Sequence, residues 1–237
     1  MMDILRKAGV TLLDYGYVLR HQVRSEFDRS TPDALVAAAG GLAPVVLLPG
    51  IFETWRFLRP LATHIHGQGH PVHVVTALER NLMAIAEAAT IVADHLARHD
   101  LTDVTIVAHS KGGLVAKHLM GMPGAGERIR RTVAVCTPFA GSTLARFVPF
   151  ESVRSLQPTN ADLLRLAEVR DVNARIVAVT GWFDPHIPNA GPLEGARNVQ
   201  LTTSGHFRIL ASPELLALVD RLLAEDAETG ADAGAQS

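Results

Sequence analysis

Six short apolar runs, separated by stretches with helical periodicity, constrain the fold of this chain of 237 residues more than any other feature. Each run is five or six residues long and rich in aliphatic residues, as expected of strands buried on both faces of a sheet. The runs occupy residues 43–48, 71–76, 103–107, 132–136, 175–179 and 198–202. Strands that alternate with helices predict an α/β fold, with a mostly parallel sheet covered by helices on both faces.

The stretches between and beside the runs predict helices over residues 33–40, from 55 to near 67–69, and over 83–99, 112–120, 162–169 and 213–223. A hydrophobic content of 48% and this length suit one large domain, which we place at 43–223. The stretch between Thr137 and Arg175 has room for a loop and one or two helices, so we expect no large cap domain. The tail 224–237 has almost no large apolar side chains and is predicted to be disordered.

Residues 1–42 are predicted to form an N-terminal helical segment outside the main domain. An amphipathic helix is indicated there by helically spaced apolar pairs at Ile4, Leu5, Leu12, Leu13, Val18 and Leu19. Its mixed charge favours docking on its own domain, and weak contact of residues 1–20 with a membrane surface is the alternative. Charged residues interrupt the segment too often for a signal-peptide core or a membrane span, so we expect a cytoplasmic protein.

The charge balance limits which binding partners are expected, and the cysteine content indicates the redox compartment. Lys and Arg number 22 against 24 Asp and Glu, so no broad cationic field favours binding to nucleic acid or to anionic lipid. Cys136 is the only cysteine, which excludes an internal disulfide and fits a reducing compartment. The oligomeric state is left open by the sequence.

Ser110 lies between the strand run 103–107 and the helix 112–120. The carboxyl ends of parallel strands are where open α/β proteins form their clefts. Small residues stand two positions before and after the serine, Ala108 and Gly112, as the close packing of strand on helix at a nucleophile elbow requires. The pattern G-x-S-x-G, present as A-H-S-K-G, predicts a nucleophilic serine, and a chance turn of small residues is the alternative.

A nucleophilic serine needs a histidine to accept its proton and an acid to orient that histidine. His206 follows the last predicted strand, and Gly205 allows its loop to reach back to the serine. His109 adjoins the serine, so its side chain should point away from the hydroxyl and pack near the site. His186 precedes the last strand and is interpreted as a loop or pocket residue.

Asp184 follows the predicted strand 175–179, which places serine, acid and histidine in the order that a hydrolase of this architecture requires. Asp162 and Asp171 are alternative acids. Asp184 could also do no more than start the turn with Pro185.

Backbone amides must hold the oxyanion formed during acyl transfer. The amide of Lys111 is one predicted donor, and the loop after the first strand supplies the other, with Ile51 preferred and Phe52 as the runner-up. Proline followed by glycine in that loop is also a common turn. The Lys111 side chain is predicted to face solvent, since a cation is unfavourable at a helix start, and Lys111→Met is expected to retain activity.

Four histidines raise the alternative of a metal site: His64, His66, His70 and His73. Without a nearby cysteine or an acidic cluster, we interpret them as ordinary exposed or packed side chains and predict no metal. A serine, histidine and aspartate triad also requires no cofactor, so none is predicted.

Several segments resemble the α/β-hydrolase superfamily, and within it bacterial triacylglycerol-lipase-like carboxylesterases. LLPGIFETWRFLRPLA is similar to their oxyanion loop, with proline in place of the usual histidine. AHSKGGLVAKHL is similar to their elbow, with lysine where methionine, glutamine or leucine is commoner. CTPFAGS, GWFDPHIPN and SGHFRIL are similar to further lipase segments, the last two to the acid and histidine loops. The resemblance covers residues 44–223 and implies the α/β-hydrolase fold and ester hydrolysis.

The predicted activity is hydrolysis of small-molecule or lipid esters with apolar acyl or alcohol groups, through an acyl-enzyme on Ser110. The predicted pocket is lined by Phe52, His109, Phe139, Phe147 and Phe150. Thioester hydrolysis or acyl transfer by the same triad is the alternative. A non-catalytic binding protein is a further one, and the acyl-chain length is left open.

Overall fold

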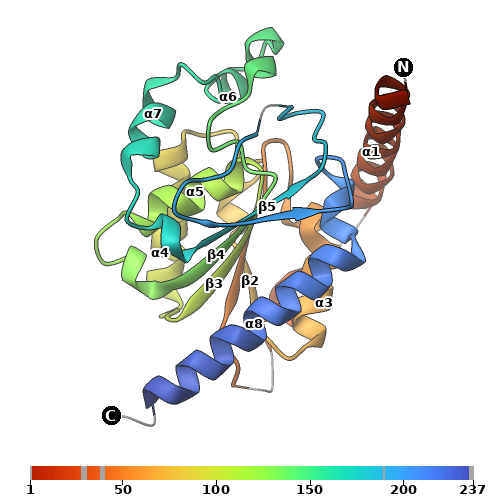
Figure 1. The fold of residues 1–237 in the computed structure, drawn as a ribbon. Helices are drawn as coiled ribbons and strands as arrows, with labels where there is room; N and C mark the ends of the chain where they lie inside the picture. Colours follow the sequence, from red (N-terminus) through yellow and green to blue (C-terminus); the bar gives the residue numbers. More distant parts are fainter. Residues whose placement is uncertain (1, 28–30, 38–40, 189, 235–237) are drawn as a thin grey trace.

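The computed structural model describes residues 2–27, 31–37, 41–188 and 190–234 (Figure 1). Its centre is a six-stranded sheet in the order β2-β1-β3-β4-β5-β6, and every strand pair is parallel. The strands are β1 (Val45–Leu48), β2 (Val72–Val74), β3 (Val104–His109), β4 (Ile129–Val135), β5 (Ile176–Gly181) and β6 (Arg197–Leu201). Each overlaps one predicted apolar run, and the predicted parallel α/β sheet is confirmed.

Helices cover both faces of the sheet (Figure 1). On one face lie α4 (Ile85–Arg98), α5 (Lys111–Met120) and α7 (Ala161–Glu168), and on the other lie α3 (Arg59–Gly67) and α8 (Pro213–Gly234). The side chains of β1 alternate between the two cores: Val46 and Leu48 pack with α4 and α5, whereas Val45 and Leu47 pack with α3 and α8.

The connection from the carboxyl end of β4 to the amino end of β5 holds only short elements (Figure 1). They are η4 (Thr143–Phe147), α6 (Glu151–Arg154), α7 and η5 (Asn173–Arg175). The remaining short elements are α2 (Asp33–Val36), η1 (Trp55–Leu58), η2 (Thr76–Leu78), η3 (Gly126–Arg128) and η6 (Arg208–Ala211). The described residues therefore contain no large cap domain.

Helix α1 (Met2–Phe27) docks on η1 and η6, but of the apolar pairs noted in the sequence only Val18 packs against the core. Val10 and Asp14 are buried, and the ring of Tyr17 packs edge-on against Phe57. The outward side chains, which are 60% to 75% exposed, are Ile4, Leu5, Leu12, Leu13 and Leu19. None of the helices in the described ranges is long and apolar enough to cross a bilayer.

Helix α8 continues to Gly234, so the prediction of disorder from Ala224 is wrong for this stretch. Polar contacts hold the helix where large apolar side chains are absent. Asp226 is buried, lies 2.8 Å from Arg131 and accepts a hydrogen bond from the Thr105 hydroxyl at 2.9 Å. The last part of the predicted tail, 235–237, lies outside the described residues.

Candidate active site

The backbone bends sharply at Ser110, between β3 and α5. Ser110 has a φ of +50° and a ψ of −122°, a conformation that residues other than glycine rarely adopt. Its amide donates to the Val135 carbonyl of β4 at 2.9 Å. The bend leaves Ser110 in the wall of a cavity at the carboxyl edge of the sheet.

Close packing around this bend explains the small neighbouring residues. A Cβ atom at Gly112 would lie 2.4 Å from the carbonyl oxygen of Leu48, too close for any side chain. A Cβ atom at Gly50 would lie 3.0 Å from the Cβ of Ser110. The end of β1 therefore touches the start of α5, and the loop after β1 lies beside the serine.

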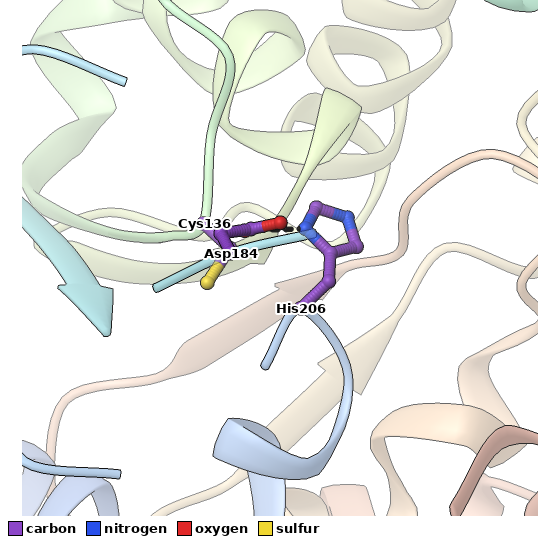
Figure 2. Close-up of side chains that lie close together, drawn as sticks. All are labelled: Cys136, Asp184 and His206. Carbon is purple, nitrogen blue, oxygen red and sulfur yellow. Dashed lines mark hydrogen bonds and ion pairs between the residues drawn. The ribbon is translucent and has the colours of Figure 1, made fainter. Parts of the chain in front are cut away.

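His206 and Asp184 form a buried pair (Figure 2). The Nδ1 atom of His206 lies 2.7 Å from Oδ2 of Asp184, while Oδ1 accepts the amides of His186 and Ile187 at 2.8 and 3.0 Å. Burial would raise the pKa of Asp184, but the charge of His206 and these hydrogen bonds hold that pKa well below its usual range. The side chain of Asp184 is therefore ionised, and both of its oxygens have hydrogen-bond partners.

The electrostatics at His206 also favour a proton acceptor. Burial alone would lower the pKa of His206, but the nearby carboxylates of Asp184, Glu53 and Asp14 outweigh it and raise the pKa. A carboxylate at Nδ1 favours the tautomer in which that nitrogen carries the proton. The free Nε2 is then available to accept a proton.

Ser110 and His206 line the same cavity. Among the hydrogen bonds of the described residues, none joins the Ser110 hydroxyl to the His206 imidazole. Catalytic hydrogen bonds are often long before substrate binds and tighten in the complex. The pairing of Ser110 with His206 therefore stays a prediction.

The amides predicted to bind an oxyanion differ in availability. Lys111 is the first residue of α5, so its N–H has no acceptor within the helix. Within the described part of the chain, the Ile51 amide has no hydrogen-bond acceptor, whereas the Phe52 amide donates to the Arg80 carbonyl at 2.8 Å. Ile51 is accordingly the better candidate for the second donor.

The cavity beside Ser110 has a volume of about 710 Å³, which suits a small organic ligand. Of the side chains predicted to line a substrate pocket, Phe52, Phe147 and Phe150 line this cavity, whereas His109 and Phe139 do not. His109 is fully buried behind this wall, with Nδ1 2.9 Å from a carboxylate oxygen of Glu53, a residue that does line the cavity. Phe139 instead packs against the core on the α4 and α5 side of the sheet.

Solved structures resemble this arrangement of elements. Aspergillus fumigatus lipase B superposes with a TM-score of 0.69 at 16% identity, over 80% of this chain and 54% of the lipase. The mature Bacillus licheniformis lipase BlEst2 gives 0.61 at 16% identity, over 79% and 94%. An extracellular alpha/beta-hydrolase from a Paenibacillus species gives 0.54 at 17% identity, over 76% and 98%. The chain has the α/β-hydrolase fold.

Among the comparisons with known proteins, only the structural one supports the α/β-hydrolase fold. No model of a known protein family matches the sequence, and no curated protein matches it either. The chain spans about half the length of the Aspergillus lipase. At these identities the likeness establishes the fold, and the activity has to be argued from the site.

The prediction that the Lys111 side chain faces solvent is wrong in this α/β-hydrolase fold. The side chain is buried, and Nζ donates to the carbonyls of Asn81, at 2.9 Å, and Met83. The Asn81 side chain in turn donates to the Pro49 carbonyl at 2.8 Å. Burial lowers the pKa of Lys111 to about 8. The ammonium thus ties α5 to the loop before α4, and through Asn81 to the predicted oxyanion loop.

Two buried acids beside the candidate site were missed in the sequence analysis. Glu53 accepts the Gly50 amide at 2.7 Å and lies against His109, and Asp14 of α1 accepts the His206 amide at 2.9 Å. Glu53 lies five residues after the predicted strand 43–48, just as Asp184 lies five residues after 175–179, so the rule that singled out Asp184 would also have reached Glu53. Asp14 precedes the first strand and lies outside that rule. The one sequence signal for Asp14 is a charge inside an otherwise apolar helical stretch.

The structure shows where the alternative acids, Asp162 and Asp171, and the loop histidine His186 lie. Asp162 and Asp171 are exposed, and Asp162 pairs with Arg165 of its own helix, so neither replaces Asp184. His186 lines the cavity. Burial and the charge of His206 lower the pKa of His186 to about 4, so its ring is neutral at pH 7.

Within the described residues, one group of three side chains brings metal-ligand atoms within 4.8 Å of one another: Cys136, Asp184 and His206 (Figure 2). Burial raises the pKa of the Cys136 thiol well above its usual range. A neutral thiol is a poor ligand, and the acid and imidazole already bind each other. Asp184 and His206 therefore form a hydrogen-bonded pair, and together with the neutral thiol they make a poor metal site.

The four histidines considered as metal ligands are not part of that group. His64 binds Asp220 at 2.8 Å, and His70 lies 2.9 Å from the Ala43 carbonyl oxygen. His73 packs its ring against those of His95 and His99.

Proposed function

We propose that this protein hydrolyses carboxylic esters with apolar acyl or alcohol groups through an acyl-enzyme. The observation that carries the proposal is the shared cavity: Ser110, in its strained conformation, and His206, held by a buried carboxylate, both line it. The presence of two lipases among the solved structures with this fold agrees with such an activity.

In the proposed reaction, the Ser110 hydroxyl attacks the acyl carbon while its proton passes to Nε2 of His206. The amides of Ile51 and Lys111 donate to the oxyanion. The oxygen–carbon bond of the ester then breaks, His206 returns the proton to the leaving alcohol, and the acyl group stays on Ser110. A water molecule, deprotonated by the same imidazole, releases the carboxylic acid and restores the serine. Asp184 orients the imidazole and balances its positive charge throughout.

The cavity wall favours a neutral ester as substrate. Its lining is mostly apolar, and the rings of Phe52 and Phe150 meet edge-on with centroids 5.2 Å apart. Among the described residues, no lysine or arginine lines the cavity. Phosphate esters would lack a cationic partner there, and the phosphates of an acyl-CoA would have to remain outside. This is why we rank thioester hydrolysis and acyl transfer below ester hydrolysis.

An acyl-chain series tests the proposal. Wild-type protein should hydrolyse p-nitrophenyl esters faster than acyl-CoA of equal chain length, and Ser110→Ala should lose about 10⁶-fold in kcat. Faster turnover of acyl-CoA would support the thioester alternative. Absence of Ser110-dependent turnover with every ester and thioester, in a folded protein, would leave a binding protein as the better interpretation.

We also propose that the outer face of α1 contacts a lipid surface. At about 100° per residue, the exposed side chains of Ile4, Leu5, Leu12 and Leu19 share one face of the helix. Tyr15 lies on the same face, is 52% exposed and also lines the cavity. The apolar face is therefore continuous with the cavity mouth, as a lipid ester held at a surface would require.

A further inference from the structure

Helix α1 reaches the loop of His206 through one buried side chain. Asp14 is fully buried, its Oδ2 accepts the amide of His206, and its Oδ1 accepts the amides of Phe207 and Arg208, all at 2.9 Å. Three successive amides pointing at one carboxylate form an anion-binding nest, and hydrogen bonds to an ionised acceptor are stronger than neutral ones. Asp14 therefore holds the backbone that carries His206.

The loop is shaped to admit this carboxylate. Gly205 has a φ of +107°, and a Cβ atom there would lie 2.5 Å from Oδ1 of Asp14. Other contacts of the backbone at residues 205 and 206 come from separate parts of the chain. The Gly205 amide donates to the Phe183 carbonyl at 2.9 Å, the Cys136 thiol donates to the Gly205 carbonyl at 3.9 Å, and the His206 carbonyl lies 2.9 Å from Nε2 of His109. Asp14 is thus the side chain that binds three successive amides of this loop, those of residues 206–208.

We propose that Asp14 is a positioning residue for His206, which makes α1 part of the working active site. This inference rests on the proposed role of His206 as the proton acceptor of Ser110. Asp184 sets the orientation of the ring through Nδ1, while Asp14 sets the place of the main chain to which the ring is attached. Both constraints are needed, because a displacement of about 1 Å can lower turnover roughly 10²-fold.

Asp14 also acts on His206 through its charge. Together with Asp184 and Glu53, it contributes to raising the pKa of the imidazole above its ordinary value. Neutralising Asp14 should therefore lower the pKa of His206. A residue that only anchored α1 to the domain would leave that pKa unchanged.

Asp14→Asn is the sharpest test, because asparagine keeps the shape of the side chain. One amide oxygen still accepts two N–H groups, but the NH₂ group faces the third donor. We expect kcat with a soluble short-chain ester to fall about 10²-fold while KM changes by less than about threefold. The acid limb of the pH profile should move to lower pH. Asp3→Asn is the matched control, since this exposed acid of α1 pairs only with Lys7 on the surface, and it should behave as wild type.

Two measurements separate this inference from the proposed function. The titration of His206 followed by NMR should show a lower pKa in Asp14→Asn than in wild type, whether or not any ester is hydrolysed. Folded Asp14→Asn with an unchanged His206 titration, or with wild-type kcat in an active enzyme, would overturn the positioning role. A wild type that hydrolyses no ester would instead count against the proposed function.

Hydrogen exchange on the wild type covers the case in which Asp14→Asn does not fold. The amides of His206, Phe207 and Arg208 should exchange as slowly as those of β5, because each is bonded to the buried carboxylate. Exchange at the rate of exposed loop amides would overturn the inference.

Discussion

Replacing Lys111 by methionine removes a buried ammonium and keeps a side chain of similar length. Burial lowers the pKa of Lys111 from 10.5 to about 8. At about 1.4 kcal/mol per pKa unit, the charged lysine weakens folding by about 3 kcal/mol at pH 7. Lys111→Met removes this destabilisation.

The same substitution leaves two carbonyl oxygens without their donor. They belong to Asn81 and Met83, and each unsatisfied buried group costs about 1 to 3 kcal/mol. The gain and the loss are of similar size. We therefore expect the free energy of unfolding of Lys111→Met at pH 7 to lie within about 2 kcal/mol of wild type.

The pH dependence of stability separates the cost of burying the ammonium from the cost of leaving two carbonyl oxygens unpaired. The pKa of Lys111 is lower in the folded than in the unfolded protein, so the unfolded chain binds more protons between about pH 8 and 10.5 and wild-type stability rises with pH in that window. Between pH 7 and pH 10 the wild type should gain about 2.5 kcal/mol relative to Lys111→Met.

Urea unfolding followed by circular dichroism, at several pH values from 7 to 10, measures this difference. Lys7→Met is the control, since Lys7 is an exposed lysine paired with Asp3, and its stability should run parallel to wild type. Parallel curves for wild type and Lys111→Met would refute the reasoning, because a lysine with an unshifted pKa is not a buried one. We also expect Lys111→Met to lower kcat, contrary to the sequence-based expectation, since Lys111 holds Asn81 against the predicted oxyanion loop.

Three further predictions concern the site and α1. The acid limb of the kcat/KM profile should lie above about pH 6.5, because His206 must lose a proton whose pKa is raised; a limb below that pH would contradict the assignment. Gly112→Ala should destabilise the fold by about 2 to 3 kcal/mol in urea unfolding, since its Cβ would meet the Leu48 carbonyl, whereas Gly16→Ala, with open space around it, should not destabilise it. Leu12→Glu should weaken co-sedimentation with phosphatidylcholine vesicles and leave hydrolysis of a soluble ester unchanged; equal binding would exclude the proposed lipid contact.

Features that depend on neighbouring residues could be read from the sequence. The apolar runs predicted β1 to β5, because a strand buried on both faces must be apolar at nearly every position. The edge strand β6 is mostly exposed and alternates polar with apolar residues. The bend at Ser110 followed from small residues two positions away on each side, since strand and helix pack there at backbone distance. Asp184 and His206 were found because parallel strands deliver their following loops to one edge of the sheet.

Features that depend on distant residues were decided by the tertiary structure. The apolar pairs of α1 indicated a helix, but which face it buries depends on the amides of the His206 loop, 192 residues away, which demand the carboxylate of Asp14. Lys111 is buried because two carbonyls of another loop face it, and α8 extends past Ala224 because Asp226 meets Arg131. A hydrogen-bond donor buried by folding needs an acceptor, and only the folded chain determines which residue supplies it.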